Sequence, residues 1–171
     1  MAITAPSLKR LIAQELETVA DERVQDHVRS LLVEPEASLR DWDYGKRDEK
    51  YVCWAVLNHV RSNTGIAYCE EGFGPKTPWG LVQLSGNEGM SMGMDSGWFG
   101  TFMEAYFESF AATDLTIWRV FKTNPQTGRI PISEEQEWDA AWKRIEDLRT
   151  RDPESSYDCG HSIKYGRVSE S

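Results

Sequence analysis

Residues 51–70, YVCWAVLNHVRSNTGIAYCE, hold the pattern that decides the fold. Apolar residues fill both alternating sets of positions over 51–60, which is typical of a strand covered on both faces. The residues Arg-Ser-Asn at 61–63 suit a turn, and a second β-rich run follows at 64–70. The two runs predict an antiparallel hairpin. A turn at Ser62 and Asn63 would place His59 opposite Ile66 or Ala67, one or two pairs from Cys69.

Further strands are predicted on either side of this hairpin. They are short runs with alternating, β-branched or aromatic residues, at 38–44, 79–84 and 115–122, together with the alternating methionines at 90, 92 and 94. The connections between most of these runs are too short for crossover helices. We therefore expect a mainly antiparallel sheet of about five strands.

Helical patterns flank these strands. Apolar residues spaced three and four apart between positions 8 and 33 predict two short helices or one bent helix, with Asp21 as a cap for the second. Thr101 and Glu104 form a capping box for a later helix, and residues 133–136 form another before an apolar stripe at 138–148. The predicted class is α+β, with N-terminal helices and two later helices packed on the sheet.

The chain has 171 residues, of which 40% are hydrophobic and 27% are charged, as in an ordinary folded domain. We expect a single α+β domain over residues 1–153 and a polar, loosely packed C-terminal tail over 154–171. No apolar run is long enough to span a membrane, and the first residues lack a signal-peptide pattern. Three cysteines without a paired spacing are typical of a reduced compartment, so we expect a cytoplasmic protein.

The formal net charge of −9 is concentrated in one region. Residues 64–114 carry seven acids and one base, Lys76. Binding to nucleic acid requires clustered Lys and Arg and is therefore not expected. An acidic surface favours a basic protein partner instead.

Two glycine-rich loops, at 70–80 and 95–100, are the candidate binding face. Prolines stiffen the first loop, and rigid loops that carry aromatic and charged side chains are suited to recognition. The candidate binding residues are Glu70, Glu71, Phe73, Trp79, Asp95 and Trp98. The alternative for Phe73 and Trp79 is a structural role in which both rings close over the core.

Two other classes of function stay open at this point. A small-ligand or enzymatic cleft between the two loops would use His59 and Cys69 as polar groups. A self-associating structural module would bury tryptophans in a homodimer. His27 is expected on a polar helix face, and the pair Cys159 and His161 lacks a zinc-site spacing, so no metal or cofactor is predicted.

The sequence thus favours a small acidic cytoplasmic protein that binds or inhibits a basic protein through residues 70–100. Bacterial immunity proteins, which neutralise toxins, are similar in type: small, acidic and without catalytic motifs. The similarity is one of general character and rests on no shared motif.

Overall fold

The structure is a computed structural model that describes residues 3–41, 46, 48–71, 74, 76–85, 97–126 and 128–168. Its contacts divide the chain into two compact units, Met1–Asp114 and Leu115–Ser171. The elements of the first unit are α1 (Ala5–Glu17), α2 (Glu22–Leu31), β1 (Leu32–Arg40), β2 (Tyr51–His59), η1 (Val60–Ser62), β3 (Thr64–Tyr68), β4 (Trp79–Gln83), β5 (Trp98–Phe99), α3 (Phe102–Phe107) and η2 (Phe110–Asp114). Those of the second are β6 (Trp118–Asn124), β7 (Gly128–Glu135), α4 (Trp138–Arg151) and β8 (Ser156–His161).

The N-terminal region forms two separate helices, each with its own cap. Thr4 and Ser7 make a reciprocal capping box at the start of α1. The side chain of Asp21 accepts a hydrogen bond from the backbone N–H of Arg23 at the start of α2. These caps satisfy amide groups that have no partner within a helix, which is why the break occurs at Asp21.

The first unit contains a five-stranded antiparallel sheet in the order β1-β2-β3-β4-β5. The predicted hairpin is present as β2 and β3. Its register differs from the expected one, because His59 lies opposite Thr64 rather than Ile66 or Ala67. The connection is a 3-10 turn that ends at Asn63 in the left-handed conformation, with φ of 56°.

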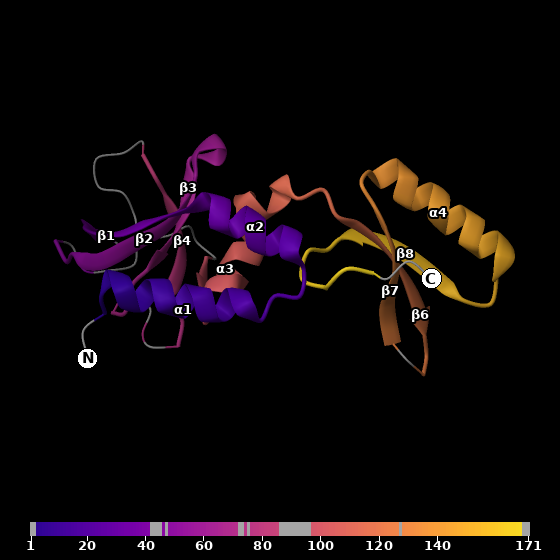
Figure 1. The fold of residues 1–171 in the computed structure, drawn as a ribbon, viewed down its shortest axis with the longest axis horizontal. Coiled ribbons are helices and arrows are strands. Elements are labelled where there is room, and N and C mark those ends of the chain that lie inside the picture. The colour runs from indigo at the N-terminus through magenta and orange to yellow at the C-terminus, as the bar shows by residue number, and fades with distance from the viewer. Residues whose placement is uncertain are drawn as a thin grey trace. The chain divides into compact units, whose positions relative to one another are not determined.

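Three helices pack on this sheet (Figure 1). Helix α1 packs against β1, α2 against β2, and α3 against β3, β4 and β5. The capping box predicted at Thr101 and Glu104 is confirmed at the start of α3. On the covered face of the sheet, Trp79 meets Phe102 of α3 edge to face, with ring centroids 5.4 Å apart.

The first strand differs from its predicted position. β1 begins directly after α2 and includes Pro35, whereas the sequence suggested a strand at 38–44. An edge strand tolerates proline, because one side of its backbone pairs with no other strand. Residues 42–45 and the alternating methionines at 90, 92 and 94 lie outside the described residues.

The second unit is a three-stranded antiparallel sheet, β7-β6-β8, covered by α4 (Figure 1). The predicted capping box at 133–136 is wrong, since most of this segment belongs to β7. Helix α4 begins at Trp138 after Glu137, whose side chain makes no capping bond. Pairing of β7 with the backbone of β6 outweighs the local capping signal.

The C-terminal segment is an integral part of this second unit. Residues 154–171 were expected to be a loosely packed tail, yet they supply β8, which pairs with β6. Tyr157 and Ile163 are both only 4% exposed. Their burial corrects the expectation of loose packing, while the prediction of one folding domain over 1–153 stays a prediction.

Arg119 on β6 is a buried charge in this unit. Its side chain is fully buried, and its Nη2 donates a hydrogen bond to Glu134 Oε1 of β7 at 2.9 Å. It also donates to the carbonyl oxygen of Ser162. These hydrogen bonds connect β6 and β7 to the segment that follows β8.

The α+β class and the mainly antiparallel sheet are confirmed. None of the helices in the described ranges is long and apolar enough to cross a lipid bilayer.

Candidate functional site

Three exposed carboxylates gather where β2 begins and β3 ends. Glu70 and Glu71 follow β3, and Glu49 precedes β2. Because β2 and β3 are antiparallel, with Trp54 opposite Tyr68, these positions lie at the same end of the hairpin. We call Glu49, Glu70 and Glu71 the acidic end.

The backbone holds this part of the chain in place. The N–H of Cys69 donates to the carbonyl oxygen of Pro78 at 2.8 Å, which extends the contact between β3 and β4. Glu70 therefore follows directly from a paired residue.

Two tyrosines experience the negative potential of the acidic end. A hydrogen bond to Glu49, together with burial and the charge of Glu71, raises the pKa of the Tyr51 hydroxyl. Burial and the charge of Glu70 raise the pKa of Tyr68. Both hydroxyls stay neutral at pH 7, so the carboxylates dominate the local potential and favour a cationic group.

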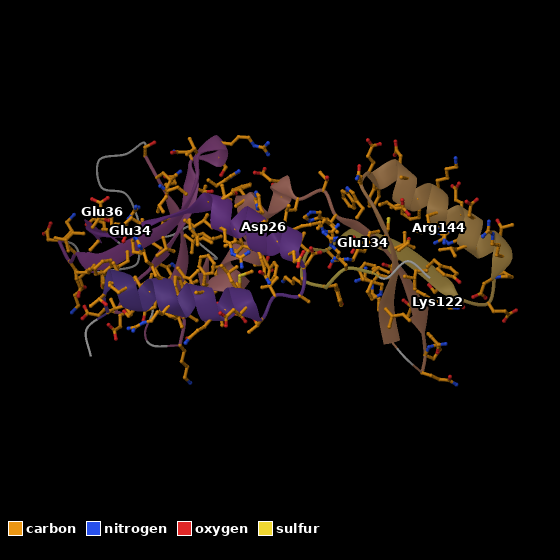
Figure 2. The ribbon with its side chains drawn as sticks, viewed as in Figure 1. Asp26, Glu34, Glu36, Lys122, Glu134 and Arg144 are labelled. Atoms are coloured by element: carbon orange, nitrogen blue, oxygen red, sulfur yellow. The ribbon has the colours of Figure 1, made fainter. Side chains whose placement is uncertain are left out.

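The edge strand of the same sheet adds two exposed carboxylates, Glu34 and Glu36 (Figure 2). Glu34 pairs with Lys9 of α1, and both side chains are more than half exposed. Such an exposed pair contributes little stability. Exposed acidic side chains thus lie on β1 as well as at the acidic end.

Trp79 does not belong to an exposed face. Its side chain is 1% exposed and packs edge to face on Tyr68, 5.0 Å between centroids, as well as on Phe102. Trp79 therefore has a structural role, in which its ring closes over the core. Two other predicted binding residues, Phe73 and Asp95, lie outside the described residues.

Trp98 is half-buried and lies on the opposite face of the sheet. Its ring covers Gly80, where a Cβ atom would come within 2.7 Å of the ring. Trp79 and Gly80 are neighbours on β4, and neighbouring residues of a strand point to opposite faces. Trp98, whose ring covers Gly80, therefore lies on the face opposite to Trp79. Of the six predicted binding residues, Glu70 and Glu71 are exposed and Trp79 is buried. Trp98 packs on the same core cluster as Tyr51, which lies beside the acidic end.

His59 and Cys69, the polar groups of the alternative cleft, are not brought together. His59 lies opposite Thr64, and Cys69 is five residues further along the chain, so strand alternation sends the two side chains to opposite faces. His59 is 4% exposed and Cys69 is fully buried.

A cluster that sequence reasoning missed joins His27, His59 and Asp114. The Nε2 atom of His59 is 2.9 Å from Asp114 Oδ2, and that of His27 is 3.7 Å from the same oxygen. Arg61 Nη2 lies 2.6 Å from the other oxygen, Oδ1. One carboxylate of η2 thus meets side chains from α2, β2 and η1.

The hydrogen bonds of this cluster assign its donors. A carboxylate only accepts, so His59 Nε2 carries the proton that reaches Asp114. Its Nδ1 lies 2.7 Å from Ser62 Oγ. Burial raises the pKa of Tyr106, whose hydroxyl lies 2.7 Å from His27 Nδ1 and serves as the donor there.

Burial also lowers the pKa of His27, although the nearby carboxylate of Asp114 opposes the shift. A neutral His27 is thus favoured in the folded state. These contacts hold η2, at the end of the first unit, against α2 and the β2–β3 hairpin. The sequence indicates this cluster only weakly. His27 follows Val24 by three residues and precedes Leu31 by four, which places it beside the buried stripe of α2.

A pocket of about 310 Å³ lies between helices and the edge strand of the first unit. Apolar and charged side chains of α1, α2 and β1 line it: Lys9, Ile12, Ala13, Leu16, Glu17, Arg29, Leu32, Val33 and Pro35. Its volume is at the lower limit for small-ligand sites. None of the residues singled out in the sequence lines it.

In the second unit, Cys159 and His161 lie on β8. Burial raises the pKa of the Cys159 thiol. The Nε2 atom of His161 donates to the carbonyl oxygen of Leu115 at 2.5 Å, so this imidazole has a backbone partner within its own unit. Within the described part of the chain, no three or more His, Cys, Asp or Glu side chains are placed to hold a metal ion.

Comparison with known proteins found no matching family model, no matching curated protein and no matching solved structure.

Proposed function

We propose that this protein is a cytoplasmic binding or inhibitor protein whose first unit recognises a basic protein through the acidic end, Glu49, Glu70 and Glu71. The observation that carries the proposal is the uneven charge. Residues 1–114 hold 18 acids and 10 bases, net −8, whereas residues 115–171 hold 10 acids and 9 bases, net −1.

The acidic end supports the proposal because its carboxylates are exposed and adjacent. Exposed charges of one sign guide an oppositely charged partner and raise the association rate by roughly 10–1,000-fold. Tyr51, which is partly buried beside Glu49 and Glu71, supplies an amphipathic ring of the kind enriched in protein interfaces. A Lys or Arg of the partner would meet carboxylates and an aromatic face together.

The test is a capture experiment with three baits. The wild-type protein is compared with Glu70→Lys/Glu71→Lys and with a control, Glu17→Lys/Glu22→Lys, which changes the net charge equally at exposed positions of α1 and α2. Each bait is exposed to lysate of the source cells at low salt and eluted with a salt step.

The proposal predicts a basic protein that the wild-type and control baits retain and the Glu70→Lys/Glu71→Lys bait loses. Circular dichroism should show that all three baits are folded, because the substituted residues are exposed. Equal capture by all three baits, or capture of no basic protein, would contradict the proposal.

A further inference from the structure

Two buried cysteines lie close to the acidic end: Cys53 is on β2, and Cys69 directly follows β3. Trp54 of β2 lies opposite Tyr68 of β3, and Ala55 opposite Ala67. The next pair in the same register is Cys53 and Cys69. Both cysteines are free and fully buried.

Their side chains point to the same face and touch. Cys53 and Cys69 share a core cluster with Ala67 and Val82, and the two thiols are hydrogen-bonded. Directly opposed residues of antiparallel strands have Cα atoms about 4.5–5.5 Å apart. A disulfide needs about 4.4–6.8 Å, so the backbone already satisfies its main requirement.

We propose that Cys53 and Cys69 are a redox pair that closes to a cross-strand disulfide when the protein meets a small-molecule disulfide. The inference goes beyond the proposed function and does not depend on partner binding. Cys159, on β8 of the second unit, takes no part.

The chemistry is two successive thiol–disulfide exchanges. The thiolate of one cysteine attacks a sulfur of the small disulfide, forms a mixed disulfide and releases one small thiolate. The second cysteine attacks the sulfur of the first and releases the other. The two protons of the cysteine thiols end on the two small thiols, so the protein is oxidised by two electrons and the small disulfide is reduced by two.

The surroundings assign an order to the two steps. Cys69 directly follows β3 and precedes the exposed Glu70, whereas Cys53 lies within β2, so Cys69 attacks first. The hydrogen bond to Cys69 and burial raise the pKa of Cys53. The positive charge of Arg40 acts on Cys53 in the opposite direction and supports its thiolate in the second step.

Arg40 is itself an unusual feature of this site. Its side chain is buried, with 7% exposed, and Nη1 donates to the carbonyl oxygen of Gln83 at 2.9 Å. Its Nε has no hydrogen-bond partner in the described part of the chain. The charge of this buried cation partly offsets the burial that disfavours the Cys53 thiolate.

The test uses full-length Cys159→Ser protein, which retains only the proposed pair. It is incubated with oxidised glutathione, with a low urea concentration to permit opening of the buried strands, and then quenched with acid and alkylated. We expect both remaining thiols to be lost, a disulfide-linked peptide pair containing Cys53 and Cys69, and full recovery of both thiols with dithiothreitol.

Two further measurements make the result decisive. Cys53→Ser/Cys159→Ser should stop at a stable glutathione adduct on Cys69, because the second exchange has no attacking thiol. Retention of both thiols in Cys159→Ser after the amide of Cys69 has exchanged with deuterium would overturn the proposal. An end product with glutathione on Cys69 in Cys159→Ser would also overturn it.

Discussion

Replacing Asp114 with alanine should destabilise the first unit strongly, because it removes the acceptor that His59 needs. The imidazole of His59 is buried, with 6% of its side chain exposed, and its Nε2 lies 2.9 Å from that carboxylate. A hydrogen bond to a charged group contributes about 1.5–3 kcal/mol, and leaving a buried donor unpaired costs a similar amount.

The pair between Asp114 and Arg61 adds little to this cost. The side chain of Arg61 is 76% exposed, and exposed ion pairs contribute about 0–1 kcal/mol. We therefore expect Asp114→Ala to cost about 2–3 kcal/mol, a fall of roughly 10 °C in melting temperature for a unit of this size. Arg61→Ala, the control on the same carboxylate, should cost less than about 1 kcal/mol.

The assay is urea denaturation combined with hydrogen exchange of the β2 and β3 amides, which reports on the first unit even if the two units unfold in separate transitions. Stability of Asp114→Ala within about 0.5 kcal/mol of the wild type would refute the reasoning. An equal loss in Arg61→Ala would refute it as well, since the exposed ion pair would then be the important contact.

Three further predictions concern His27, Gly80 and Glu134. Because burial holds the pKa of His27 below its ordinary value of 6.5, the unfolded state binds more protons between the two values. The stability of the first unit should therefore fall as pH drops below about 6.5, and His27→Gln should flatten that dependence in melts from pH 7.5 to 5. Gly80→Ala should cost about 1–3 kcal/mol in denaturant unfolding by forcing the Trp98 ring away, and an unchanged midpoint would contradict the contact. Glu134→Ala should destabilise the second unit by about 3 kcal/mol, as measured by calorimetry, because it leaves Arg119 charged and buried; Glu134→Gln, which keeps an acceptor, should cost less.

Local patterns predicted the parts of the fold that depend on nearby residues. The hairpin of β2 and β3, the helix break at Asp21 and the capping box at Thr101 each arise within a few residues. The register of the hairpin was wrong because the turn includes an additional 3-10 segment, which the residue types at 61–63 do not specify.

Features that depend on distant pairing were missed. Residues 133–136 resemble a helix cap, yet β7 pairs with β6 and Glu134 meets the buried Arg119. β8 lies in a polar segment whose pairing with β6 is invisible in local sequence. In both cases the partner strand, rather than local propensity, determines the structure.

The candidate site was predictable only in its charge. Glu70 and Glu71 are exposed, as is usual for charged side chains that follow the end of a strand. Trp79 lies in a strand whose two faces are both apolar, so sequence alone does not decide which face the helices cover. The contact of His27 and His59 with Asp114 joins residues 55 or more positions apart and left no periodic signal.

The central claim is most directly tested by the association rate of the captured basic protein, measured by stopped flow from low to moderate salt. If the acidic end guides the partner, Glu70→Lys/Glu71→Lys slows association at low salt by about tenfold or more and weakens its salt dependence, while Glu17→Lys/Glu22→Lys has a clearly smaller effect. Equal rates for the two variants would mean that net charge alone attracts the partner, and would contradict recognition through the acidic end.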